Sequence, residues 1–444
     1  MPYLPEVHSC LTDSPSPAYW LISYDKHGRE RREEDRLLSE ELANVLVHDN
    51  VTDVILLAHG WNNDLSDAQQ QYCDWARLLM SQTMNKERLL KKRPSFKPVL
   101  IGMHWPSLAW GDEGMGAFPV MADSESMVDR YARQIADSPA ARQALDLLLS
   151  AAEDDLSPEM LPEAVVAAYR VLFREAMLGT DMGMEPGLEE TEFDPEMVYQ
   201  QTNNVSEAYP ATFGGGIAGG LLAPLRILSF WTMKKRALTI GETAAYPLLR
   251  RLRSAVAGRD VRFHGMGHSF GCIVMSAMIA GPLGSTREAG VIDTVFLVCG
   301  ALSLWSYAQS IPPVPDERGR FHQLIADQMV KGLMLAVCSK HDTANRVFYP
   351  IAAGVAGQVA YLVEGHDLPK YGALGIFGAQ GGGVPAVERV MGDAGAEYGF
   401  VSGGIYNLDG SAWIRHGSFP TGAHNDILHP EVAHAFWQAM EVGA

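Results

Sequence analysis

Short apolar segments alternate with longer segments of helical periodicity through most of this chain of 444 residues. The apolar segments are rich in Val, Ile and Leu and are bounded by glycine or polar turn residues. Such alternation is typical of buried parallel strands joined by crossover helices. In the N-terminal part, the pattern predicts strands at 18–24, 51–60 and 97–106 and helices at 39–49 and 65–82.

The alternation is interrupted at 107–235. This segment contains an acidic helix-prone stretch, a glycine-rich apolar stretch at 213–231 and 9 of the 20 methionines. Methionine adapts its shape to irregular apolar surfaces. We therefore expect a helical, Met-rich insertion that forms a lid or cap, with a separately packed satellite core as the alternative. Pro224 and Arg226 leave the apolar stretch too short to span a bilayer.

The alternating pattern resumes after the insertion. We therefore expect one α/β core that is formed by two parts of the chain, 1–106 and 236–444. The second part predicts helices at 240–256, from Gly271 onward and at 429–440, and strands at 260–265, 294–300 and 333–339 and within the sequence GIYNLDGSAWI.

The charge balance and the cysteines limit the environment of the protein. Lys and Arg number 35 against 53 Asp and Glu, a net charge of −18, which repels nucleic acid and anionic membrane surfaces. The five cysteines are odd in number and lack CxxC spacing, and no secretory signal is visible at the N-terminus. We expect a reducing, cytoplasmic location and no nucleic-acid partner; contact with a membrane stays open, as does the oligomeric state.

A serine flanked by glycines, Gly267-His268-Ser269-Phe270-Gly271, follows one predicted strand and opens the next helix. A strained corner between a strand and a helix projects its central side chain into a cleft. Side chains at Gly267 or Gly271 would collide with the neighbouring strand or helix, and the corner residue takes an unfavourable backbone conformation. Ser269 is therefore a candidate nucleophile, with a serine in an ordinary glycine-rich turn as the alternative.

A serine hydroxyl becomes a nucleophile only when a base removes its proton and an acid orients that base. Asp342 lies just beyond the carboxyl end of a predicted strand, where a short carboxylate can reach an imidazole. Asp367 and Glu364 are the alternative acids. Asp342 and His424 are 82 positions apart, which leaves room for a second insertion at 350–400.

Three histidines near the C-terminus are candidates for the base. His434 lies within the last predicted helix, and His429 precedes a proline at a position typical of a helix cap. His424 lies in the loop between the last strand and the last helix, from which it can reach the edge of the sheet. We therefore assign the base to His424.

Two backbone N–H groups are candidates to stabilise an oxyanion. Phe270 follows the serine at the start of a helix, where the N–H and the helix dipole favour negative charge. The second donor is expected from the His59-Gly60-Trp61 turn after an early strand, because Gly60 permits close approach and the Trp61 N–H follows it. An ordinary strand-terminating turn is the alternative.

The order Ser269, Asp342, His424, the glycine-flanked corner and the upstream His-Gly-Trp turn together resemble the α/β-hydrolase superfamily, in its serine esterase and lipase-like branch. The resemblance covers roughly 15–106 and 236–444. It implies a mostly parallel eight-stranded sheet, a lid inserted between strands, and no cofactor.

The chemistry expected is two-step hydrolysis of a carboxylic ester through an acyl-enzyme. Aromatic residues in or beside the insertion favour an apolar or acyl-ester small molecule as the substrate. These aromatic residues are Trp105, Trp110, Phe213, Phe230 and Trp231. The residues expected to line the substrate site are His59, Gly60, His268, Trp105 and Trp110.

Other functions share parts of this pattern. An amidase, a thioesterase or an acyltransferase uses the same three side chains, and a non-catalytic binding protein can have the same fold. A metallohydrolase is a further alternative, since His424, Asp426 and His429 are close in sequence. Their spacing matches no established metal motif, and we expect no metal.

Overall fold

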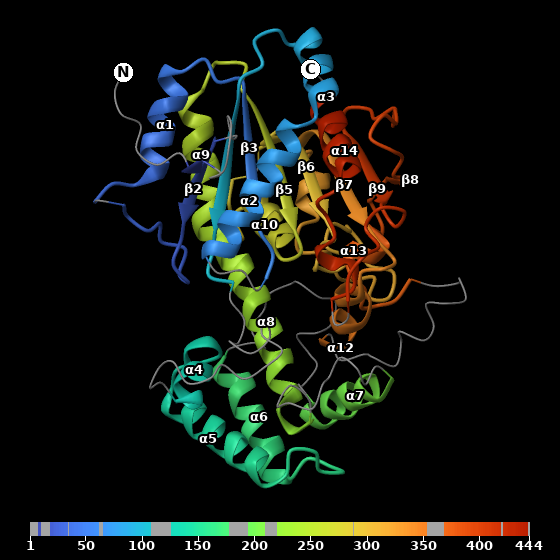
Figure 1. Ribbon diagram of the computed structural model, residues 1–444. Coiled ribbons are helices and arrows are strands. Elements are labelled where there is room, and N and C mark those ends of the chain that lie inside the picture. Colours follow the sequence, from blue (N-terminus) through green and yellow to red (C-terminus); the bar gives the residue numbers. More distant parts are fainter. Residues whose placement is uncertain are drawn as a thin grey trace.

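The computed structural model has a parallel sheet at its centre (Figure 1). Eight strands lie in the order β2-β4-β3-β5-β6-β7-β9-β8, and each neighbouring pair is parallel. A two-residue strand, β1, pairs antiparallel with β2 at one edge. The expected α/β class with a mostly parallel eight-stranded sheet is therefore confirmed.

The structure describes residues 8–9, 18–33, 35–61, 65–107, 126–176, 194–208, 220–286, 288–352, 368–418 and 421–442. The strands are β1 (His8–Ser9), β2 (Ala18–Ser23), β3 (Asp53–Ala58), β4 (Pro98–His104), β5 (Arg262–His268), β6 (Ile292–Val298), β7 (Val330–Cys338), β8 (Ala386–Val390) and β9 (Gly404–Asp409).

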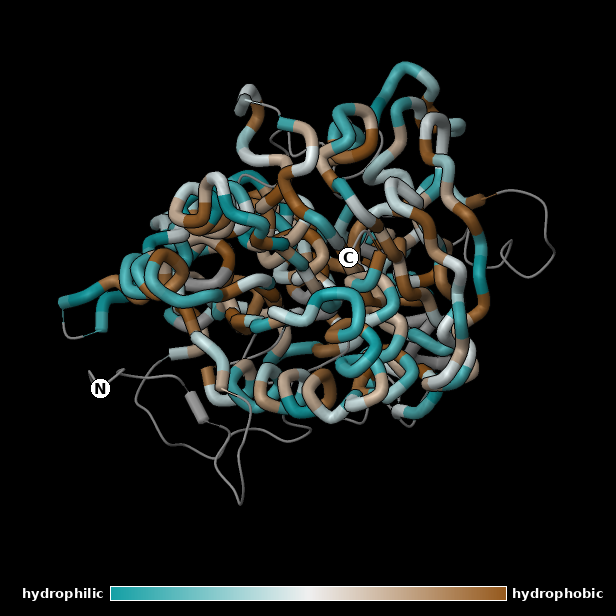
Figure 2. Tube along the Cα trace, turned by 90° about the horizontal axis from the view of Figure 1, so that it is seen from above, coloured by the Kyte–Doolittle hydropathy of each residue, from teal (hydrophilic) through white to brown (hydrophobic). Residues whose placement is uncertain are grey.

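Burial of both faces explains why the central segments are strands. Along β3, Val54 and Leu56 belong to one hydrophobic cluster, whereas Ile55 and Leu57 belong to the cluster on the other face. Figure 2 shows hydrophobic residues gathered in the interior of the trace and hydrophilic residues on its outer turns. One face packs against α1 (Leu38–His48), α9 (Tyr246–Ala255) and α10 (Gly271–Ala280), and the other against α2 (Leu65–Met80), α3 (Thr83–Lys92) and α14 (Pro430–Glu441).

The sequence pattern predicted the long strands but missed β8. This strand lies at the edge of the sheet, and four of its five residues are exposed. Its sequence includes Glu388 and Arg389, so it lacks the apolar run that marks a buried strand. The periodicity on which the other strands were predicted depends on burial, which β8 does not have.

Helices occupy the described parts of the segment between β4 and β5. Figure 1 shows α4 to α7 in a layer beyond the end of the sheet and α8 reaching from that layer to the sheet. These helices are α4 (Met127–Gln134), α5 (Pro139–Asp154), α6 (Glu163–Glu175), α7 (Pro195–Ala208) and α8 (Ala223–Ile240).

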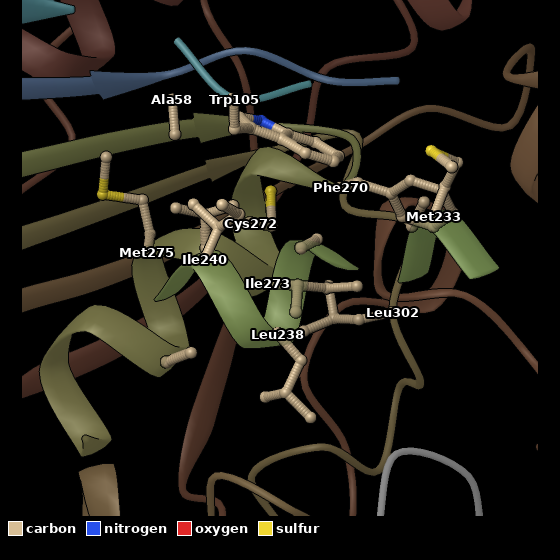
Figure 3. Close-up of a cluster of buried hydrophobic side chains, with 14 of the residues drawn as sticks. Ala58, Trp105, Met233, Leu238, Ile240, Phe270, Cys272, Ile273, Met275 and Leu302 are labelled. Carbon is tan, nitrogen blue, oxygen red and sulfur yellow. The ribbon is translucent and has the colours of Figure 1, made fainter. Parts of the chain in front are cut away.

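The helix α8 continues through one π-helical turn, η2 (Gly241–Ala245), directly into α9. Residue 235 therefore falls inside a continuous helix, and α8 joins α9 without a loop. Gly241 allows this helix to cross α10 closely, since a Cβ there would lie 2.4 Å from Cβ of Ala277. Figure 3 shows Met233 and Leu238 near Phe270 and Ile273.

Three further observations concern expectations from the sequence. Cys272, Cys299 and Cys338 are free and buried. Cys73 on α2 is disulfide-bonded, which a reducing compartment does not predict, because disulfides persist mainly in oxidising ones. No described helix has both the length and the apolar composition to cross a bilayer.

The remaining short helices are η1 (Gly220–Leu222), α11 (Gln323–Ala326), η3 (Ala344–Phe348), α12 (Tyr349–Ala352), α13 (Leu374–Phe377) and η5 (Ala423–Asn425).

A buried carboxylate, Asp53, joins β3 to β5 at the amino ends of the strands. Its Oδ1 lies 3.1 Å from Nε2 of His264 and 4.0 Å from Nη1 of Arg93, and Thr52 Oγ1 donates to Oδ2. Burial alone would raise the pKa of Asp53, but His264, Thr52 and Arg93 outweigh burial and lower it. Because the unfolded value is about 3.9, Asp53 stabilises the fold above about pH 4 and this contribution is lost as the pH falls through the lower folded pKa.

We expect Asp53→Asn to lower the free energy of unfolding by about 3 kcal/mol at neutral pH, because it leaves buried His264 without its carboxylate and removes the buried carboxylate beside Arg93. The difference from the wild type should shrink below about pH 4. Urea unfolding at several pH values measures both effects. Asp260→Asn is the matched control, since this carboxylate is 90% exposed and lies 3.5 Å from the same arginine. Equal shifts for the two variants, or a pH-independent loss for Asp53→Asn, would contradict the assignment.

Candidate functional site

Ser269 lies at the corner between β5 and α10, in the conformation that the sequence predicted. Its φ of +55° is in the left-handed region, which residues with side chains seldom adopt. A Cβ at Gly267 would lie 2.5 Å from the carbonyl oxygen of Gly271, and a Cβ at Gly271 would lie 2.2 Å from that of Ala58. Both flanking positions therefore require glycine.

The corner brings Ser269 into hydrogen-bonding contact with His424. The Ser269 Oγ lies 2.8 Å from Nε2 of His424, and Nδ1 of His424 lies 2.8 Å from Oδ2 of Asp342. Because a carboxylate only accepts, Nδ1 carries the imidazole proton and Nε2 is left to accept the proton of the serine hydroxyl. Ser269, His424 and Asp342, the three side chains chosen from the sequence, therefore form one hydrogen-bonded row.

Pairing between two loops positions Asp342 and His424. Asp342 and Gly422 form an isolated β-bridge, and the N–H of Ala423 donates to the carbonyl of His341 at 3.0 Å. Gly422 has a φ of +57°, and a Cβ there would lie 2.3 Å from Oγ1 of Thr343. The close approach of the two loops thus depends on glycine at position 422.

Asn345 is a polar partner of Asp342 that the sequence reasoning missed. Its main-chain N–H donates to Oδ1 of Asp342 at 3.0 Å, and its Nδ2 donates to Oδ2 at 2.7 Å. The same Nδ2 lies 2.8 Å from the carbonyl oxygen of Cys299. Asp342 has no exposed surface, so these bonds and the one from His424 replace its hydration. The Asp-x-x-Asn spacing after a buried strand is a signal that could have indicated this contact.

The His59-Gly60-Trp61 turn lies directly beside the corner. A Cβ at Gly60 would lie 2.8 Å from Cβ of Ser269, so this position also requires glycine. Among the described residues, no protein group accepts a hydrogen bond from the main-chain N–H of Trp61 or of Phe270. Trp61 follows Gly60, which packs against Ser269, and Phe270 follows Ser269 in the chain, so both N–H groups belong to residues beside the corner.

The imidazole of His59 forms hydrogen bonds with main-chain groups of this turn and of the chain after β4. Its Nδ1 lies 2.8 Å from the carbonyl oxygen of Gly60, and its Nε2 accepts from the N–H of Trp105 at 3.2 Å. The ring is therefore neutral, with its proton on Nδ1. Burial, followed by the neighbouring His104, lowers the pKa of His59 to about 3.

Three side chains expected near the substrate are buried. His59 and Trp105 have no exposed surface, and His268 is 3% exposed. The indole of Trp105 stacks on His59 and donates to its carbonyl oxygen. The polar atoms of His59 and Trp105 are therefore bonded to other protein groups. Trp110, the fourth side chain expected near the substrate, lies outside the described residues.

The alternative histidines have partners elsewhere. His434 Nδ1 lies 2.9 Å from Oδ1 of Asn85, and its Nε2 lies 2.7 Å from the carbonyl oxygen of Ala396. His429 Nε2 lies 3.0 Å from Oδ1 of Asp426. In the ranges that the structure describes, no three His, Cys, Asp or Glu side chains converge as metal ligands would. The alternative acids Asp367 and Glu364 lie outside those ranges.

We expect Gly422→Ala to disrupt the pairing of the two loops, because the new Cβ would overlap Thr343. This overlap should lower the free energy of unfolding by about 1–3 kcal/mol, in addition to the cost of placing an alanine at a positive φ. Gly403→Ala is the matched control, since Gly403 also has a positive φ but a Cβ there meets nothing within 4 Å. Thermal unfolding should show the larger loss for Gly422→Ala. Equal losses would mean that backbone strain alone acts at both positions.

Comparisons with known protein families, with curated proteins and with solved structures find no match to this chain. They assign neither a family nor an activity. An activity has to be inferred from the arrangement of Ser269, His424 and Asp342.

Proposed function

We propose that the protein is a serine hydrolase of the α/β-hydrolase type, which cleaves a carboxylic ester through an acyl-enzyme. The observation that carries this proposal is the row of two 2.8 Å contacts from Ser269 through His424 to Asp342. The row lies at the carboxyl ends of parallel strands, where ligands bind in open α/β sheets. The strained serine corner and the eight-stranded sheet agree with the resemblance seen in the sequence.

In the first step, Ser269 Oγ attacks the ester carbonyl while Nε2 of His424 accepts its proton. Asp342 stabilises the imidazolium, and the N–H groups of Trp61 and Phe270 donate to the oxyanion. The C–O bond to the alcohol then breaks, and His424 returns the proton to that oxygen. A water molecule, deprotonated by His424, attacks the acyl carbon, which releases the acid and restores the serine hydroxyl.

The contact between His59 and Gly60 supports the role given to Trp61. The carbonyl of Gly60 and the N–H of Trp61 belong to the same peptide plane, and in a trans peptide they point in opposite directions. When His59 Nδ1 binds the carbonyl, the Trp61 N–H points away from His59. Because Gly60 is packed against Ser269, this orientation favours an N–H directed toward the reacting carbonyl.

Aromatic side chains beside the two N–H donors favour an apolar acyl group. The Phe230 ring of α8 lies 5.1 Å from the ring of Phe270 and 6.0 Å from that of Trp61. The centroid of the Tyr349 ring lies 5.8 Å from that of the Phe230 ring. A large apolar surface next to a reacting carbonyl stabilises a hydrophobic acyl chain through burial. The proposed lid function of the inserted helices rests on this contact between Phe230 and the corner.

Ser269→Ala should lower ester hydrolysis by at least about a thousandfold and abolish labelling by a fluorophosphonate probe, because the nucleophile is absent. Ser402→Ala, at an exposed serine of the loop before β9, should react as the wild type does. Mass spectrometry of the labelled peptide identifies the modified residue. A wild-type protein that is folded but neither labelled nor active on ester, thioester and amide substrates would exclude this function.

Phe230→Ala should shift the preference among acyl esters toward longer or bulkier chains, because it removes the ring that contacts Phe270 and Trp61. The expected change in relative kcat/KM is about 10-fold, the lower end of the effect of one methylene in an apolar pocket. Leu147→Ala, at an exposed position of α5, is the control. An unchanged profile across a chain-length series would show that Phe230 does not line the acyl site.

A further inference from the structure

The residue before the proposed nucleophile, His268, contacts the loop that carries the proposed base. Its Nε2 lies 2.8 Å from the main-chain carbonyl oxygen of His424, and the centroids of the two rings are 4.9 Å apart. Because a carbonyl oxygen only accepts, Nε2 of His268 carries a proton and donates it. This bond fixes the tautomer of His268.

His268 is a neutral group. Burial, followed by the nearby His424, lowers its pKa to about 3, and His59 acts in the same direction. From α2 it faces the uncharged ring of Trp75, at a centroid distance of 6.5 Å. Its Nδ1 has no hydrogen-bond partner among the described residues. An uncharged His268 can support His424 without placing a second positive charge beside the imidazolium that forms there.

The bond from His268 has no equivalent nearby. Within the described ranges, no other hydrogen bond links β5 or its corner to the main chain of 421–427. The hydrogen bond of Ser269 is with the ring of His424, which also contacts the ring of His268. His268 and Ser269 are adjacent on one strand end. The end of one strand therefore carries both the nucleophile and a group that holds the main chain at the base.

We propose that His268 is a positioning residue, whose Nε2–H binds the carbonyl of His424 and thereby sets the distance from its imidazole to Ser269 Oγ. This inference rests on the proposed function for its effect on rate. It concerns a residue that the sequence assigned to the substrate site. Misplacement of a catalytic group by about 1 Å can lower a rate by about a hundredfold.

The test compares two substitutions that differ in one hydrogen-bond donor. His268→Phe preserves a ring but has no donor, whereas His268→Gln retains an N–H close to the position of Nε2. We expect His268→Phe to lower kcat by about 10- to 100-fold with KM unchanged within about twofold. His268→Gln should recover kcat to within about fivefold of the wild type.

The control for loss of a buried imidazole from the same strand is His264→Gln. His264 is bonded to Asp53 at the other end of β5 and should affect stability without changing kcat of the folded enzyme. If His268→Phe keeps the wild-type kcat, or if His268→Gln loses as much as His268→Phe, the positioning role is excluded. A loss that merely follows the folded fraction, measured by circular dichroism, would also exclude it.

A second measurement separates failure of this inference from failure of the proposed function. Long-range ¹H–¹⁵N spectra of ¹⁵N-histidine-labelled protein report the tautomer of each imidazole without any substrate. We expect His268 to remain in the Nε2–H form from about pH 5 to 8, and the His424 signal to be altered in His268→Phe but retained in His268→Gln. A titrating or Nδ1–H His268 would overturn the inference, even in a protein with full esterase activity. Absence of activity together with the expected spectra would instead overturn only the proposed function.

Discussion

The site depends on the close contact between Gly271, the first residue of α10, and the carbonyl of Ala58 at the end of β3. This contact lets α10 begin immediately after β5, and the abrupt turn requires the positive φ of Ser269. The chain that leaves β3 continues into Gly60, which packs against Cβ of Ser269. The neighbouring strands β3 and β5 therefore position both Ser269 and the turn that flanks it. This positioning requires no side chain from the C-terminal loops.

Much of this arrangement could be predicted from the sequence because it depends on local patterns. Buried strands produce apolar runs, and the glycines at 267 and 271 are necessary for a corner at Ser269. The choice of His424 over His429 and His434 followed from the last predicted helix, which contains His434 and begins just after His429. The structure brings together the serine, the acid and the base that were selected, and their chemical roles remain a proposal.

The remainder depends on contacts between segments far apart in sequence. Nothing in the local pattern indicates that His268 binds the carbonyl of a residue more than 150 positions away, or that the ring of His59 accepts the N–H of Trp105, which lies 46 positions further along the chain. The sequence analysis placed both histidines at the substrate site. Burial gives them a different environment, in which each imidazole satisfies a main-chain oxygen. The edge strand β8 was missed for the opposite reason, since it has no buried face to give its sequence a period.

The uninterrupted path from α8 through η2 into α9 has a mechanical consequence. A continuous helix resists bending along its length, and Gly241 seats this one against α10 at a place where no larger residue fits. Tilting the outer end of α8 therefore requires either deformation of the π turn or sliding along α10, the helix that starts at the serine corner. A tilt of α8 that moves Phe230 away from Phe270 would therefore also act on the helix that starts at the Ser269 corner.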